Sequence, residues 1–188
     1  ALKRGLSQKE IDTNRDILRM AAMLHDVGKV AISDLILKKP GRFNNDEFEI
    51  MKQHTILGAQ LFRGRQSDFD DAASQVAFTH HERWDGKGYP GYVDIQSGNP
   101  LADHVAPDGS PLGKKGEEIP IFGRIVALAD VYDALSSARI YKEAWEQSEV
   151  LDTIEKEAGY HFDPDLVEIF FSSIDIIRSI QQRYSDSE

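Results

Sequence analysis

Hydrophobic residues recur at spacings of three and four along most of this chain, which is the period of an amphipathic α-helix. The first helix is expected to open with a capping box at Ser7 and Glu10 and to end near Gly28. A second helix is expected from about Asn44, and a third from about Asp71. The first half of the chain is therefore predicted to be helical.

Helical spacing returns after Pro120, a residue suited to the first position of a helix. A shorter helix is expected over residues 148–158, closed by Gly159, and Asp163-Pro164 should open a terminal helix rich in Ile and Phe. The chain contains no internal repeat, and its 188 residues suit one domain. We therefore predict a single all-α domain over residues 1–188.

Residues 92–118 are the exception to the helical pattern. Turn-forming pairs follow one another there, including Ser97-Gly98, Asn99-Pro100 and Asp108-Gly109. A loop of this length inside a domain is usually functional or mobile. We expect a long irregular insertion, with a short strand over residues 92–95 as its only candidate for β-structure.

Composition narrows the classes of function. The formal net charge of −10 argues against a nucleic-acid-binding protein, but not against one that acts on a small phosphorylated substrate. No apolar run approaches the roughly 18 residues that a membrane span needs. Because the chain has no cysteine, a metal would have to be held by His, Asp and Glu. We expect a cytoplasmic protein without membrane contact.

Six metal-binding side chains fall at positions that are predicted to point inward: His25, Asp26, His54, His80, His81 and Asp130. Six donors exceed one tetrahedral site and suit two divalent ions that share a bridging carboxylate, for which we choose Asp26. Any one of these histidines, taken alone, is more often a core or surface residue, so the prediction rests on their joint occurrence. His104 and His161 are interpreted as structural or surface residues.

The sequence also carries a set of longer motifs that lie around these donors. They are His25-Asp26-Val27-Gly28-Lys29, Lys39-Pro40-Gly41, Met51-Lys52-Gln53-His54, the run from His80 to Pro90, Gly116-Glu117-Glu118-Ile119-Pro120, Arg124, the run from Ala129 to Leu135, Arg139 with Tyr141-Lys142, and His161-Phe162-Asp163-Pro164. Over nearly the whole chain, this set resembles the HD-GYP domains, a branch of the HD phosphohydrolase superfamily.

The resemblance implies an HD-domain helical bundle with two or three metals in its core, usually iron or manganese. It implies that the six donors bind the metals and that Lys29 contacts the scissile phosphate. Arg139 and Lys142 match cations that hold the phosphates or guanine of the substrate, although without the resemblance they could be solvated surface cations. Tyr89 would lie beside the substrate cleft, in a surface implicated in contacts with GGDEF-domain proteins.

The chain departs from this family in two respects. Family members supply a further His, and for a third metal a Glu, from a helix that would precede Ser7. Residues 1–6 read as the tail of an earlier segment, so we expect an N-terminally truncated fragment whose full-length protein has a sensory or receiver domain upstream. The insertion over residues 92–118 replaces a usually short connection and is interpreted as a lid or a determinant of substrate choice.

The resulting hypothesis is a hydrolase of cyclic di-GMP, a bacterial second messenger, that produces pGpG and/or GMP. A metal-bridging hydroxide would attack phosphorus, with Asp26 and Lys29 as the catalytic residues. One alternative is a phosphodiesterase for mixed cyclic GMP–AMP. A second is a non-catalytic module that binds cyclic di-GMP or a GGDEF domain, and a third is a general HD-type nucleotide phosphohydrolase.

Overall fold

The structure is a computed structural model that describes residues 5, 7–62, 64, 67–137 and 145–185. Its helices in chain order are α1 (Gln8–Ala22), the 3-10 helix η2 (Val27–Ala31), α2 (Asp34–Leu37), α3 (Asn45–Lys52), α4 (His54–Gln60), α5 (Asp68–Thr79), the 3-10 helix η3 (Gly116–Glu118), α6 (Ile121–Ser136), α7 (Gln147–Lys156), α8 (Pro164–Ser172) and α9 (Ile174–Ser185). No β-strand forms within the described residues, and the predicted all-α fold is confirmed. None of the described helices has the length and apolar character that crossing a bilayer requires.

Capping side chains start the helices where the sequence provides them. The predicted capping box of Ser7 and Glu10 is present, and Asn44 caps α3 in the same way. The third helix begins at Asp68 rather than Asp71, because the Ser67 side chain accepts a hydrogen bond from the amide of Asp70.

Three predicted helices are shorter or divided in the structure. The first ends at Ala22 and passes through a turn into η2, instead of continuing to Gly28. The second is interrupted at Gln53, between α3 and α4, and the terminal helix is interrupted at Ser173, between α8 and α9. The first two breaks matter for function because His25 and His54 lie directly at them.

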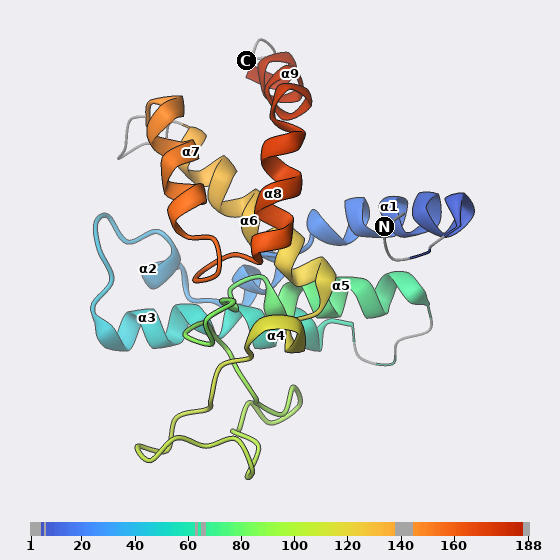
Figure 1. Cartoon of the computed structure of the whole chain (residues 1–188). Coiled ribbons are helices and arrows are strands. Elements are labelled where there is room, and N and C mark those ends of the chain that lie inside the picture. Colours follow the sequence, from blue (N-terminus) through green and yellow to red (C-terminus); the bar gives the residue numbers. More distant parts are fainter. Residues whose placement is uncertain (1–4, 6, 63, 65–66, 138–144, 186–188) are drawn as a thin grey trace.

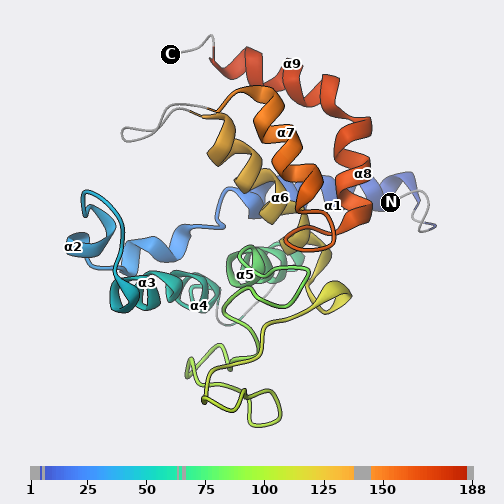
Figure 2. The same cartoon turned by 60° about the vertical axis from the view of Figure 1, so that its left-hand side comes forward.

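Helix α6 lies between two groups of helices (Figures 1 and 2). On one side its Val126 joins a core cluster with α1 and α5, and on the other side Leu128 and Tyr132 join a cluster with α7 and α8. A third cluster joins α4 and α5 to Val93 of the insertion. Burial of these apolar surfaces fixes α6 against both groups, so Asp130 on α6 is held relative to α1 and α5.

Gly28 allows η2 to lie directly against α4. A Cβ atom at this position would be 1.9 Å from the carbonyl oxygen of His54 and 2.4 Å from the amide nitrogen of Gly58. Any larger residue would therefore push the two segments apart. The close approach places Asp26, two residues earlier in the chain, beside the start of α4.

Residues 92–118 form a lobe that projects from the helices (Figures 1 and 2). The lobe is held by turns and by two isolated bridges, Val93 with Pro100 and Val105 with Pro111. The strand considered over residues 92–95 does not form. The rings of Tyr92 and His104 stack within the lobe, with centroids 3.8 Å apart.

Candidate metal centre

The six predicted metal donors come from four parts of the chain. His25 and Asp26 lie in the turn between α1 and η2, and His54 is the first residue of α4. His80 and His81 directly follow α5, and Asp130 lies on α6. Four of these side chains offer ligand atoms that all lie within 4.8 Å of one another, and they are Asp26, His54, His80 and His81. We refer to these four residues as the donor cluster.

Backbone carbonyls orient three of the imidazoles. The Nδ1 atoms of His25, His54 and His80 lie 2.8, 2.7 and 3.0 Å from the carbonyl oxygens of Ala22, Met51 and Val76, respectively. A carbonyl oxygen only accepts hydrogen bonds, so each Nδ1 carries a proton. The Nε2 atoms of His54 and His80 keep their lone pairs, whereas His25 Nε2 faces a carboxylate oxygen of Asp26. Outer hydrogen bonds of this kind are typical of metal-binding histidines, because they fix both the tautomer and the ring orientation.

These Nε2 atoms converge on the two carboxylate oxygens of Asp26. Oδ1 lies 3.4 Å from His54 Nε2 and 3.8 Å from His80 Nε2. Oδ2 lies 3.4 Å from His25 Nε2. The carboxylate therefore faces the donor cluster with one oxygen and His25 with the other.

Two observations indicate that the donor cluster fits a divalent cation. Asp26 Oδ1 is buried and has no hydrogen-bond partner, a condition that costs free energy unless a cation satisfies the oxygen. The Nε2 atoms of His54 and His80 lie 3.4 Å apart, although both carry lone pairs. Imidazole nitrogens together with carboxylate oxygens suit zinc, iron and manganese.

Burial keeps the imidazoles of the donor cluster neutral. It lowers the pKa of His80 to about 3 and that of His81 to about 2, and it also lowers the pKa of His54. Burial alone would raise the pKa of Asp26, but hydrogen bonds from His25 and Lys29 lower it further than burial raises it. A neutral imidazole and an ionised carboxylate are the protonation states that metal binding requires.

A second group of side chains lies on the Oδ2 side of Asp26. His25 Nε2 is 3.7 Å from Asp130 Oδ1, and Lys29 donates to Asp26 Oδ2 at 2.5 Å. The hydrogen bond with Asp26 raises the pKa of His25. All six predicted donors and Lys29 thus lie in one region, in two groups that meet at Asp26.

Tyr89 stacks on the outermost imidazole of the donor cluster. Its ring lies 4.8 Å from that of His81, at an interplanar angle of 29°. Burial, followed by the charges of Asp26 and Asp130, raises the pKa of Tyr89, so the hydroxyl stays protonated near these carboxylates. Arg139 and Lys142, the other two predicted substrate-binding residues, lie outside the described residues.

Sequence reasoning assigned no role to Glu82, which follows His81 and is only 2% exposed. Its Oε1 accepts a hydrogen bond from the amide of Gly91 at 2.7 Å, and its Oε2 accepts one from the amide of Lys114 at 3.2 Å. Glu82 thereby joins the turn that carries Tyr89 to the end of the insertion. The sequence does contain a sign that Glu82 has a role, because it lies between two histidines and a glycine-rich turn.

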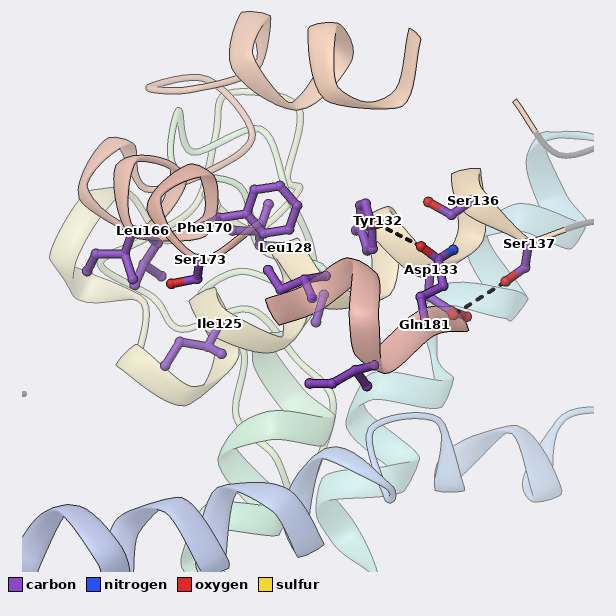
Figure 3. Close-up of a pocket in the computed structure, with 14 residues that line it drawn as sticks. Ile125, Leu128, Tyr132, Asp133, Ser136, Ser137, Leu166, Phe170, Ser173 and Gln181 are labelled. Carbon is purple, nitrogen blue, oxygen red and sulfur yellow. Dashed lines mark hydrogen bonds between the residues drawn. The ribbon is translucent and has the colours of Figure 1, made fainter. Parts of the chain in front are cut away.

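A separate cavity of about 990 Å³ lies between α6, α8 and α9 (Figure 3). Apolar side chains such as Ile125, Leu166 and Phe170 form most of its wall, and Tyr132 donates a hydrogen bond to Gln181 Oε1 at 2.9 Å. Among the described residues that line it, none is a histidine, lysine or arginine. Its chemistry differs from that of the donor cluster, which lies elsewhere.

Comparison with known proteins places this geometry in a family. The model of the HD domain family matches residues 2–135. The cyclic di-GMP phosphodiesterase response regulator RpfG of Xanthomonas campestris is 42% identical over 164 residues, which are 87% of this chain and 37% of that protein. The 3′3′-cGAMP-specific phosphodiesterase 2 of Vibrio cholerae is 36% identical over 182 residues, which are 97% of this chain and 30% of that protein.

The chain therefore spans about a third of the length of these relatives. A crystal structure of a cyclic GMP-AMP-specific phosphodiesterase from V. cholerae shares the fold, with a TM-score of 0.57 at 22% identity. The match covers 97% of this chain and 44% of that one. The family match and the identities to these relatives establish that the chain belongs to the HD domain family.

Proposed function

We propose that this chain is the catalytic part of a metal-dependent phosphodiesterase that hydrolyses cyclic di-GMP to pGpG and/or GMP. The observation that carries the proposal is the position of Asp26, whose two oxygens face two different groups of metal donors. That arrangement suits a carboxylate shared by two ions. The name of the X. campestris relative supports cyclic di-GMP as the substrate.

Each side of Asp26 offers its own donors. His54, His80 and His81 would bind one ion together with Oδ1, and His25 and Asp130 would bind a second ion together with Oδ2. We propose iron or manganese, since both accept mixed nitrogen and oxygen ligands. A third ion would need donors beyond these six.

The ions, when bound, would polarise the phosphoryl oxygens and make a water molecule more acidic. Asp26 would fix the position of one metal site relative to the other. The neutral imidazoles would leave their Nε2 lone pairs available for metal binding. Lys29, which donates to Asp26 Oδ2, would add positive charge where the phosphoryl oxygens become more negative. The hydrogen bonds of His54, His80 and Lys29 within the chain, and the stacking of Tyr89 on His81, support these roles.

Other parts of the proposal concern the substrate and partners. Arg139, Lys142 and Tyr89 would hold the dinucleotide, because a dianion needs cations beyond the metals and an Arg fork suits phosphate or guanine. The Gly88-Tyr89-Pro90 turn stays a predicted contact for GGDEF-domain proteins. An upstream sensory or receiver domain and a cytoplasmic location also stay predictions.

A mixed cyclic GMP–AMP dinucleotide is the second candidate substrate. It is favoured by the V. cholerae relative, whose name specifies 3′3′-cGAMP and which matches 97% of this chain. The two substrates share the phosphodiester and one guanine, so the donor cluster would serve both. They differ in one purine, and the side chains that contact the bases would decide between them.

The decisive experiment is turnover of cyclic di-GMP by protein loaded anaerobically with Fe(II) or Mn(II), with the products separated by chromatography. The control is the His25→Ala/Asp26→Ala variant, and a matched surface control is Asp152→Ala, which changes an exposed carboxylate on α7. We expect pGpG or GMP from the wild type and from the surface control only. Bound metal without turnover of either dinucleotide would contradict the proposed function.

A further inference from the structure

Two side chains on α3, Phe48 and Lys52, extend the ring system of Tyr89 toward the surface. The rings of Phe48 and Tyr89 meet edge to face, with centroids 6.1 Å apart and an interplanar angle of 81°. Lys52 Nζ lies 4.9 Å from the centroid of Phe48 and 5.6 Å from that of Tyr89. Phe48 nevertheless remains 43% exposed. We refer to Phe48 and Lys52 as the α3 rim.

The α3 rim is connected to the donor cluster by direct ring contacts. Tyr89 stacks on His81 on one side and contacts Phe48 on the other. Lys52 is the last residue of α3 and precedes His54 by two positions. An exposed phenylalanine is common by itself, but this one lies at the outer end of a continuous path that begins at a proposed metal ligand.

We propose that the α3 rim is a purine subsite, in which a base of the dinucleotide stacks on Phe48 and its edge accepts a hydrogen bond from Lys52. The subsite rests on the proposed function, because a phosphodiester bound at the donor cluster brings its bases to the surrounding surface. Stacking on exposed aromatic rings is the usual way in which proteins hold unpaired bases.

Lys52 makes the subsite selective for guanine. Guanine presents two adjacent acceptors, O6 and N7, to a cation, whereas adenine presents a donor beside its N7 acceptor. In the structure Lys52 is paired with Glu49 at 2.6 Å, and the Glu49 side chain is 67% exposed. The Lys52 side chain is 27% exposed. An ion pair that stays open to solvent on the Glu49 side contributes little free energy, so Lys52 can exchange Glu49 for a base at small cost.

The first test compares Phe48→Ala with Ile50→Ala, which truncates another exposed apolar side chain of α3 that is 39% exposed. Loss of one stacked base should raise the KM for cyclic di-GMP by about 5- to 150-fold. The kcat, the metal content and the unfolding midpoint should change little, Phe48→Tyr should restore the KM, and Ile50→Ala should behave as the wild type. A wild-type KM in Phe48→Ala or in Phe48→Leu would overturn the subsite.

The second test does not depend on turnover. In the metal-loaded Phe48→Trp variant, GMP should quench the added tryptophan fluorescence at lower concentrations than AMP, and ribose 5-phosphate should leave it unchanged. Adding Lys52→Met should reduce the preference for GMP by about fivefold or more. Equal quenching by ribose 5-phosphate, or none at saturating GMP, would overturn the subsite, whereas a wild type without turnover would contradict only the proposed function.

Discussion

The donor cluster and the base of the insertion are each organised around one carboxylate, and the two carboxylates differ in their hydrogen bonds. Asp26 Oδ1 is buried and has no hydrogen-bond partner, although the imidazoles of the donor cluster surround it. Glu82 uses both oxygens, which accept from the amides of Gly91 and Lys114. Asp26 has an acceptor left over for a cation, and Glu82 already has a protein partner for each oxygen.

The comparison shows that burial alone does not identify a ligand. Glu82 is the more buried of the two residues, at 2% exposed, while the side chain of Asp26 is 36% exposed. The pKa of Glu82 is accordingly raised, because the effect of burial exceeds the opposing effect of its hydrogen bonds. Because, of the two, only Asp26 has a buried oxygen without a partner, Asp26 is the candidate metal ligand and Glu82 is a candidate structural residue.

The largest expected effect is that of Asp26→Ala. Changes to the outer partners of metal ligands already reduce metal affinity or activity by about 10- to 100-fold, so loss of a shared ligand should reduce both by more than about 100-fold. Metal content by mass spectrometry and turnover of cyclic di-GMP would measure the two losses. Full turnover at the wild-type metal content would show that Asp26 is not a shared ligand.

Lys29→Met tests whether the positive charge of Lys29 contributes to catalysis independently of metal binding. If Lys29 stabilises charge that develops on the phosphoryl oxygens, the kcat should fall by about 100-fold or more, since single donors of this kind contribute that much. The metal content should persist, because Lys29 donates to Asp26 and is not a ligand. Loss of metal in Lys29→Met but not in Lys29→Arg would instead assign Lys29 to positioning Asp26.

Glu82→Leu, unlike the substitutions at Asp26 and Lys29, should lower the stability of the fold more than the metal affinity or the kcat. It leaves two amides without acceptors, at about 1–3 kcal/mol each, so the free energy of unfolding should fall by about 2–6 kcal/mol. Urea denaturation would measure this loss, and Glu82→Gln, which keeps one acceptor oxygen, should recover part of it. Unchanged stability together with loss of metal would mean that Glu82 acts on the site and not on the loop.

Acidification should destabilise the metal-free protein. Burial lowers the folded-state pKa of His54, His80 and His81 below the ordinary value near 6.5, so the unfolded chain binds more protons below that pH. Their stabilisation is present above about pH 6.5 and is lost as the pH falls, by about 1 kcal/mol per histidine and pH unit.

His25 should affect the pH dependence of stability in the opposite direction. Its folded-state pKa is raised, so its contribution is present below pH 6.5 and is lost at higher pH. His25→Gln should therefore make the fall in Tm between pH 7.5 and pH 5.5 steeper than in the wild type. A Tm that is flat or rises on acidification would show that the buried histidines are not held neutral.

Local signals in the sequence predicted the helix starts well. The capping boxes at Ser7 and Asn44 depend on residues three positions apart, and both occur in the structure. The breaks after Ala22 and at Gln53 were missed because they depend on packing between segments, such as the close approach of Gly28 to α4. Helical periodicity continues through such breaks and gives no sign of them.

The six donors could be predicted from the sequence because their positions were expected to face inward. The sequence could not predict that they form two groups on either side of Asp26. Which oxygen faces which imidazole depends on the turn after α1, and no periodicity describes that turn. The same limit applies to the α3 rim, because Phe48 and Tyr89 are 41 positions apart in the sequence and meet only through the fold. Contacts of this kind follow from the packing of α3 against the glycine-rich turn.

The smallest expected effect compares two adjacent lysines at the end of the insertion. Lys114 Nζ donates to the Gly91 carbonyl at 2.7 Å and lies 4.2 Å from the centroid of Tyr92, whereas Lys115 is exposed. Lys114→Met keeps the apolar stem but removes the hydrogen bond and the cation–π contact, so the free energy of unfolding should fall by about 1–2 kcal/mol. Lys115→Met should change it by less than about 0.5 kcal/mol.

The same two variants test whether the insertion reaches the site. If the insertion positions Tyr89 through Lys114 and Gly91, Lys114→Met should also alter the KM for cyclic di-GMP, with the metal content unchanged. Lys115→Met should leave the KM at the wild-type value. Equal effects of the two substitutions on stability and KM would mean that the Lys114 side chain does not hold the base of the insertion, and that the hydrogen bonds of Glu82 hold it instead.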